Sequence, residues 1–205
     1  MKLRYRYRFY PTEAQARTLA QTFGCARYVY NWALEARERA YREDGENLST
    51  YDLSKQLTAL KREEATAWLA EVSSVPLQQA VRNLGMAYTN FFEGRAGRPR
   101  FKSRRDRQSA TYTKNAKFKY ASTDDGPSLA LPKLGRLNIR WSRVPPSEPS
   151  SVTITRDAAG RYFVTLVCDA PRREAPPAER AAVGVDLGLA HFCTLSTGEK
   201  IENPR

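Results

Sequence analysis

The chain opens with Met1-Lys-Leu-Arg-Tyr-Arg-Tyr-Arg-Phe-Tyr10, in which cationic and apolar side chains alternate. Successive side chains of a strand point to opposite faces, so this stretch has one cationic and one apolar face. The cationic residues are Lys2, Arg4, Arg6 and Arg8, and the apolar residues are Leu3, Tyr5, Tyr7 and Phe9. Because so short a strand is not stable alone, the pattern predicts a half-buried strand within a sheet formed by later residues.

The cationic face of this predicted strand has two interpretations. Charged side chains can protect a solvated sheet edge from aggregation, and a row of cations can also follow the phosphates of a nucleic acid. No acidic residue interrupts the four cations. The absence of acidic residues favours the second interpretation, in which all four cations contact nucleic acid.

Composition narrows the class of protein. The chain has 205 residues, 41% of them hydrophobic and 27% charged, which is ordinary for a globular protein with one large or two small domains. Its net charge of +12 is not ordinary and indicates a polyanionic partner: nucleic acid or, less often, an acidic membrane surface.

The positive charge is concentrated in a second segment, residues 94–119, where ten Lys and Arg residues face the single acid Asp106. Four aromatic residues lie among or beside these cations: Phe101, Tyr112, Phe118 and Tyr120. Cations with interleaved aromatics suit both phosphate contact and base stacking, although a basic run is more often a solvated loop. The residues predicted to bind nucleic acid here are Arg98, Arg100, Phe101, Lys102, Arg104, Arg105, Arg107, Lys114 and Lys117.

The three cysteines, Cys25, Cys168 and Cys193, form no close pair, which excludes a C-x-x-C zinc motif and a disulfide framework. Cys168 and Cys193 are predicted to be small buried hydrophobes. No apolar run reaches the roughly 18 residues of a membrane span. We therefore expect a soluble, cytoplasmic protein that associates with the nucleoid.

Four helices are predicted between residues 12 and 92. Thr12 and Gln15 form a capping box that opens the first, and Gly24 separates it from a second that runs to Tyr41. Ser49 and the acid three positions later cap the third, and a fourth begins at residues 74–76. The expected result is a helical bundle, residues 11–94, inserted after the first strand.

From residue 109 onward the periodicity is that of strands. Short strands are predicted at residues 110–113, 117–120, 129–131, 137–141, 151–155 and 162–167, the last two as a hairpin. Together with residues 1–10 they predict a small antiparallel barrel of OB-like type, a common platform for single strands and RNA. Residues 171–180, rich in Pro and charge, are predicted to be a linker.

The last apolar run contains Val183-Gly-Val-Asp-Leu-Gly188 and predicts a short buried strand that ends at Asp186, with a second strand at residues 192–195. An unpaired buried carboxylate costs several kcal/mol, so such an Asp needs a metal, an arginine or backbone donors. The alternative is an ordinary Asx turn. His191, beside the turn, is predicted to be an exposed hairpin histidine rather than a general base.

Six motifs in order make the chain resemble the TnpB (OrfB) family, transposon-encoded relatives of type V CRISPR effectors. The motifs are Arg8-Phe-Tyr-Pro-Thr12 with Gln15, Phe23-Gly-Cys-Ala-Arg-Tyr-Val-Tyr-Asn31, Leu77-Gln-Gln-Ala80 with Asn90-Phe-Phe92, Gly97-Arg-Pro-Arg-Phe-Lys102, Leu131-Pro-Lys-Leu-Gly135, and Val183-Gly-Val-Asp-Leu-Gly188 with Ile201-Glu-Asn-Pro204. Each motif is weak alone, but their order is specific.

The resemblance implies an α+β fold of four parts. These are a wedge barrel (residues 1–10 and 95–170), a helical recognition insertion (11–94), a linker (171–180) and the first strands of an RNase H-like (RuvC) nuclease domain (181–205). Family members bind a guide RNA and cut the double-stranded DNA that pairs with it, next to a short recognised motif. A companion transposase can be encoded nearby.

The resemblance also implies roles for individual residues. Asp186 matches the first catalytic carboxylate and is the expected ligand of Mg²⁺ or Mn²⁺. Tyr51, Gln78 and Thr113 fall where relatives contact the target-adjacent motif.

The chain departs from the family in its acids. A two-metal site needs carboxylates from separated segments, whereas Glu199 and Glu202 follow Asp186 too closely, and the zinc-binding four-cysteine ribbon is absent. We therefore expect a nuclease-inactive N-terminal portion of a TnpB-type protein. The alternative is a binding-only module or repressor derived from one. A third hypothesis, an actin-like ATPase suggested by Asp186-x-Gly188, is disfavoured by the basic barrel before it.

Overall fold

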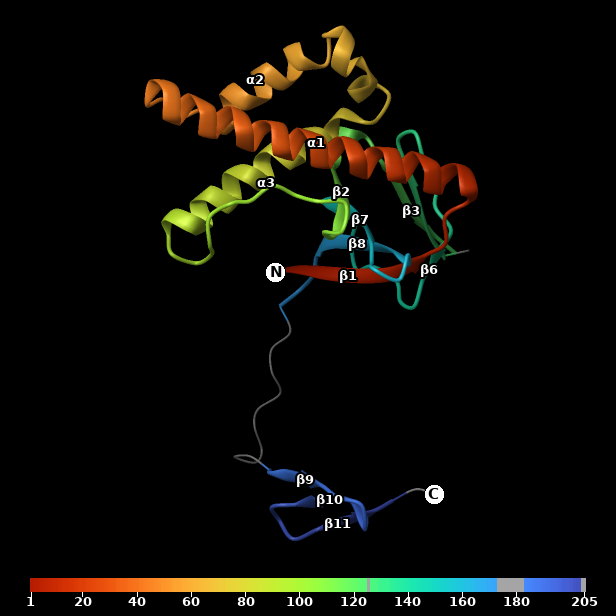
Figure 1. The fold of residues 1–205 in the computed structure, drawn as a ribbon. Helices are drawn as coiled ribbons and strands as arrows, with labels where there is room; N and C mark the ends of the chain where they lie inside the picture. The colour runs from red at the N-terminus through yellow and green to blue at the C-terminus, as the bar shows by residue number, and fades with distance from the viewer. Residues whose placement is uncertain (125, 173–182, 204–205) are drawn as a thin grey trace. The chain divides into compact units, whose positions relative to one another are not determined.

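The computed structural model describes residues 1–124, 126–172 and 183–203. The chain falls into two compact units, residues 1–170 and 171–205 (Figure 1). Most of the predicted linker, residues 173–180, lies outside the described residues. The domain boundaries expected from the sequence therefore stay a prediction, and the two units are taken in turn.

The first unit is built around strand β1 (Lys2–Phe9), which pairs antiparallel along its whole length with β8 (Tyr162–Asp169). Its last two residues also pair with β6 (Ile139–Arg140). The sheet continues through β7 (Ser151–Arg156) to β2 (Gln108–Thr113), in the order β2-β7-β8-β1-β6. Tyr7 and Phe9 are 2% and 1% exposed, so the predicted apolar face is confirmed.

The predicted barrel is not closed. A second antiparallel sheet of β3 (Lys119–Thr123), β4 (Gly126–Leu131) and β5 (Gly135–Arg136) accompanies the first, and within the described residues no strand pairing joins the two. The edge strand β6 is only two residues long, and the core face of the sheet packs against residues of helix α1 (Glu13–Asp44), helix α3 (Ser74–Phe92) and the second sheet. Helices α1 and α3 lie beside the sheet in Figure 1. The architecture is therefore α+β with open antiparallel sheets.

The two predicted helices on either side of Gly24 are a single helix, α1 (Glu13–Asp44). The Thr12–Gln15 capping box begins it, as predicted, and Gly45 with a φ of 69° ends it. A glycine inside a helix costs about 1 kcal/mol relative to alanine, which is too little to break it here. Its neighbours Phe23 and Cys25 are both buried, so packing on either side of Gly24 outweighs that cost.

The remaining helices are α2 (Thr50–Leu60) and α3 (Ser74–Phe92), and the capping box predicted at Ser49 is present. Two 3₁₀ helices, η1 (Glu64–Ala70) and η2 (Lys114–Ala116), were not predicted. None of the helices in the described part of the chain is both long and apolar enough to cross a membrane.

Two hydrophobic clusters organise the first unit. One joins α1, α2 and α3 with η1 and the adjoining loops. The other lies on the sheet but includes the helical residues Leu19, Phe23 and Val75. Gln15 adds a polar link, because its side-chain amide donates to the carbonyls of Leu134 and Arg136 at 2.9 Å each. The sheet cluster is thus a core shared by the sheet and by residues of α1 and α3.

This shared core predicts cooperative unfolding. Replacing Phe23, 3% exposed, with alanine should lower the stability by about 3–5 kcal/mol, because it opens a cavity between α1 and the sheet. We expect the urea midpoint to fall equally whether measured by far-ultraviolet circular dichroism or by Trp141 fluorescence in a Trp32→Phe/Trp68→Phe background. Tyr28→Ala, at an exposed aromatic on the same helix, is the control. A loss confined to one probe would contradict the shared core.

The second unit is a three-stranded antiparallel sheet of β9 (Val185–Leu187), β10 (His191–Leu195) and β11 (Lys200–Glu202), in the order β11-β10-β9. The predicted burial of its first strand is wrong, because Val185 is 57% and Leu187 72% exposed. A sheet of so few short strands has almost no interior, and Cys193 is its one buried residue among those described.

Candidate nucleic-acid interface

The outer face of the five-stranded sheet carries the cations of β1. Arg4, Arg6 and Arg8 lie opposite Val167, Thr165 and Phe163 of β8, whereas the core residues Tyr7 and Phe9 alternate with them. Lys2, Arg4 and Arg6 are exposed and Arg8 is half-buried. Arg140 of β6 lies opposite Arg8 and extends the same face. The predicted cationic strand face is therefore a real surface.

An aromatic residue that sequence reasoning missed organises these arginines. The Arg6 guanidinium lies 3.8 Å from the centre of the Phe163 ring, and the Arg8 guanidinium lies 5.1 Å from it. Cation–π attraction of this kind holds a guanidinium in place without neutralising its charge. Phe163 sits in an ordinary alternating strand, so the only signal for it was its position opposite Arg8 in the sheet register.

The second basic segment is fastened to helix α1. The Asn31 side chain donates to the carbonyl of Lys102 at 2.9 Å and accepts from the Lys102 amide at 2.8 Å. Arg98 forms a 3.0 Å ion pair with Glu38, also on α1. The loop that carries the predicted binding residues is therefore held at two points.

A local turn shapes the same loop. Asp106 accepts a hydrogen bond from the Ser103 amide at 2.6 Å, and this bond is the main reason that the pKa of Asp106 lies below its ordinary value. The Lys102 ammonium lies 3.8 Å from the centre of the Tyr30 ring. Loss of hydration there lowers the pKa of Lys102, an effect partly opposed by Asp106. Asp106 thus supports the turn rather than neutralising a particular arginine.

The remaining predicted cations and stacking residues divide into exposed and buried sets. Arg100, Arg104, Arg105, Arg107, Lys114 and Lys117 are exposed, and Phe101 is 53% exposed. Tyr112 is 1% exposed and belongs to the core, so its expected part in base stacking is wrong. Phe118 and Tyr120 are partly buried against the same core. Their apolar rings were needed to fill the sheet interior.

The two basic segments meet at one cleft. Arg6 of β1 shares this cleft, about 650 Å³ in volume, with Arg104, Arg105 and Arg107 of the loop and with Arg156 at the end of β7. The lining also includes Asp106 and Asp157. We call it the arginine cleft. It joins residues about 100 and 150 positions apart in the sequence, which the linear pattern could not show.

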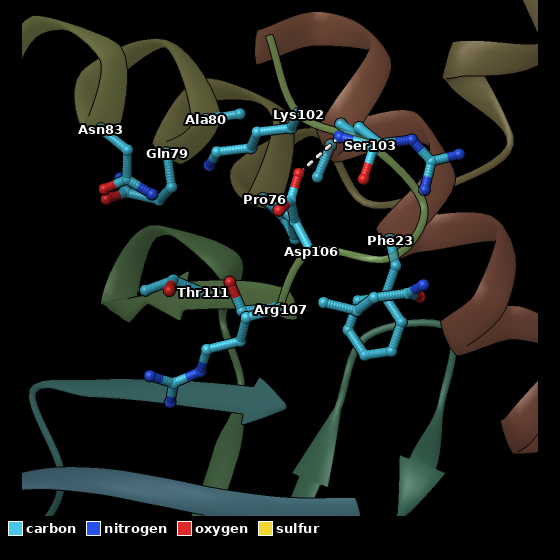
Figure 2. A pocket seen from close by; sticks show the side chains of 14 residues that line it. Phe23, Pro76, Gln79, Ala80, Asn83, Lys102, Ser103, Asp106, Arg107 and Thr111 are labelled. Carbon is cyan, nitrogen blue, oxygen red and sulfur yellow. Dashed lines mark hydrogen bonds between the residues drawn. The ribbon is translucent and has the colours of Figure 1, made fainter. Parts of the chain in front are cut away.

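A smaller pocket lies beside the loop, between α1, α3 and β2. Figure 2 shows Gln79 and Asn83 next to each other on α3, with Lys102, Arg107 and Thr111 around the same space. The bond between Asp106 and the Ser103 amide closes one side (Figure 2). Its volume is about 40 Å³, so it holds little more than solvent.

The three residues predicted to contact a target-adjacent motif lie on three elements. Tyr51, 70% exposed, is in the first turn of α2, Gln78 is exposed on α3, and Thr113 ends β2. No hydrogen bond between described residues joins them. Their role stays a prediction.

Asp186 lies in the middle of β9 rather than at its end, and it is exposed opposite Thr194. Among residues 1–124, 126–172 and 183–203, no three His, Cys, Asp or Glu side chains gather where they could hold a metal ion. The carboxylates in that part of the chain therefore do not fit a two-metal site by themselves. His191 lies 3.1 Å from Glu202 across the sheet, consistent with a hairpin histidine.

The sequence is similar to known proteins along most of its length. A protein of Streptomyces pristinaespiralis named "Putative RNA-guided DNA endonuclease" is 49% identical over 209 residues, covering 100% of this chain and 50% of that protein. InsQ of Escherichia coli K12, described in the same words, is 30% identical over 199 residues, covering 97% and 48%. Residues 1–46 match the family HTH_OrfB_IS605, described as a helix-turn-helix domain.

The chain belongs to the TnpB (OrfB) family. It spans about half the length of the curated TnpB relatives it matches. The family-matched residues 1–46 form strand β1 and the single helix α1 rather than two helices joined by a turn. Among solved structures, a chain of a Cas12f1-sgRNA-target DNA complex aligns with a TM-score of 0.40 and 9% identity, covering 98% of this chain and 57% of that one.

Residues of the TnpB motifs form structural contacts in the first unit. Thr12 and Gln15 cap α1, and Gln15 also ties it to the turn after β4. Asn31, the last residue of the second motif, holds the backbone of the Gly97–Lys102 motif through Lys102. Two TnpB motifs that are far apart in the sequence are therefore directly bonded.

Asn31→Ala should release the loop without changing its charge. We expect faster tryptic cleavage after Arg104 and Arg105, because the two hydrogen bonds to Lys102 are lost. Asn138→Ala, at an exposed asparagine, is the control. Equal cleavage rates in both variants would contradict the fastening role.

Proposed function

We propose that this protein is an RNA-guided DNA-binding protein of the TnpB type, whose first unit holds a guide RNA that pairs with double-stranded target DNA. The observation that carries the proposal is the arginine cleft, where the sheet face and the loop bring five guanidinium groups together. Cations gathered on one surface bind a phosphate backbone regardless of base sequence. The relatives named as putative RNA-guided DNA endonucleases support guided binding in particular.

The separate roles of the guide RNA and the protein follow from this chemistry. Base pairing between guide and target reads the sequence. The protein therefore needs only to bind the nucleic-acid backbones and a short adjacent motif. The exposed cations of β1 and the loop suit the first task. Gln78, Tyr51 and Thr113 are our candidates for the second.

Salt dependence tests the proposed binding surface. We expect the affinity for a fluorescein-labelled 30-nucleotide RNA to fall steeply between 50 and 300 mM KCl in anisotropy titrations. Replacing Arg98, Arg100, Lys102, Arg104 and Arg105 with glutamine should weaken binding and reduce the log–log slope by about 3.5, since each phosphate contact on a single strand contributes about 0.7.

The matched control instead removes five exposed cations from α1, α2 and the turn that follows α2. These are Arg17, Arg39, Arg42, Lys55 and Arg62. Because net charge changes equally in both variants, a general electrostatic effect would alter both slopes alike. Equal slopes would therefore contradict the assignment of the loop.

We further propose that Asp186 is a metal ligand of the nuclease site in the whole TnpB protein, within an RNase H-like fold. Mg²⁺ or Mn²⁺ would there stabilise charge on the phosphodiester. The described residues do not complete such a site, so no reaction step is derived from them.

Asp186→Asn provides the corresponding test. A single exposed carboxylate binds divalent cations at best at millimolar concentration, so we expect the purified chain to show the same weak Mn²⁺ binding as the variant by water-proton relaxation. RNA affinity should be unchanged, because Asp186 is outside the basic unit. Micromolar Mn²⁺ binding abolished by the substitution would show that further ligands complete the site.

A further inference from the structure

We propose that the arginine cleft is a built seat for one backbone phosphate of the bound nucleic acid, with Thr155 as a hydroxyl donor and Phe163 as the residue that positions Arg6. This inference rests on the proposed function and deepens it. It distinguishes one fixed phosphate from a diffuse attraction to the whole basic surface.

The first support is the charge balance of the cleft. Five arginines line it, and within the described residues none of them forms an ion pair. The two acids present are engaged elsewhere: Asp106 accepts from the Ser103 amide, and Asp157 pairs with Arg161 at 2.7 Å. The cleft therefore holds an excess of uncompensated positive charge, which an anion would offset.

The second support is a buried polar group. Thr155 is only 3% exposed, and its hydroxyl finds no hydrogen-bond partner among the described residues. A buried hydroxyl without a partner costs about 1–3 kcal/mol, and such groups are rare enough to need an explanation. Thr155 lies on the outer sheet face, between Phe163 and Ser109, and lines the arginine cleft. A phosphate oxygen is the acceptor that this hydroxyl lacks.

The third support is the fixed position of Arg6. Its guanidinium is held 3.8 Å from the centre of the Phe163 ring, and Phe163 lies directly opposite Thr155 in the sheet. A guanidinium held in advance loses less entropy when it binds a phosphate. The other cleft arginines are exposed and can rearrange around an entering phosphate.

Three substitutions give different signatures in anisotropy titrations with a 30-nucleotide RNA and KCl. Arg6→Gln should weaken binding about 10-fold and reduce the salt slope by about 0.7, because one charged contact is lost. Thr155→Val should weaken binding about 3- to 10-fold with no change of slope. It should leave the Tm of the free protein equal or higher, because an unsatisfied buried hydroxyl is removed.

Phe163→Leu should also weaken binding several-fold at unchanged slope, since it frees Arg6 without removing charge. The controls are Arg42→Gln, at an exposed arginine outside the cleft, and Thr58→Val, the same change at an exposed threonine of α2. Both should bind RNA within about 2-fold of wild type. The opposite effects of Thr155→Val on binding and on Tm exclude misfolding as the cause.

Several outcomes would overturn the phosphate seat. If wild type binds RNA but Arg6→Gln and Thr155→Val bind equally well, the seat is wrong and the proposed function stands. If 10 mM inorganic phosphate raises the Tm of wild type while the Arg6→Gln substitution leaves RNA affinity unchanged, the cleft binds a free anion instead. If wild type binds neither RNA nor DNA, the proposed function itself fails.

Discussion

The alternation of strand β1 is the constraint on which the rest of the first unit depends. Because Tyr7 and Phe9 are buried in the sheet core, Arg4, Arg6 and Arg8 must lie on the opposite face of the strand. A register shift of one residue would bury the arginines and expose the aromatics, at a cost that no local contact offsets. Burial of the apolar face by the hydrophobic effect therefore places the cations together on the opposite face. No contact specific to an individual arginine is needed for this.

The second basic segment depends on the helices instead. It has no regular structure between α3 and β2, so its position comes from Asn31, Glu38 and the turn at Asp106. Because α1 also packs on the sheet through Leu19 and Phe23, one helix fixes the loop relative to the strand face. The arginine cleft is a product of that arrangement, and the stability of the core therefore supports the geometry of binding.

The sequence predicted what local rules determine. The period of β1, the capping boxes at Thr12 and Ser49, and the hairpin of β7 and β8 follow from nearby residues, and all are present. The predictions were wrong where tertiary packing determines the structure. Gly24 did not break α1, and the strands form two separate sheets whose core also takes residues of α1 and α3, instead of a closed barrel. Tyr112 looked like a stacking residue because its neighbours are cations, but strand alternation points it inward.

The candidate site shows the same division. Most of its cations could be named from the sequence, because clustered charge is visible in one dimension. Phe163 and Thr155 could not, because their importance comes only from the strand register that sets them beside Arg6.

Position alone does not make a cation available to a ligand. Arg98 is paired with Glu38, and Lys114 lies 4.0 Å from Glu148, so these two exchange one partner for another when they bind phosphate. The cleft arginines give up no ion pair within the described chain. Exposed pairs are worth at most about 1 kcal/mol, so the difference per residue is small. The small differences add over the five guanidinium groups of the cleft. Their sum favours phosphate binding at the cleft over binding elsewhere on the basic surface.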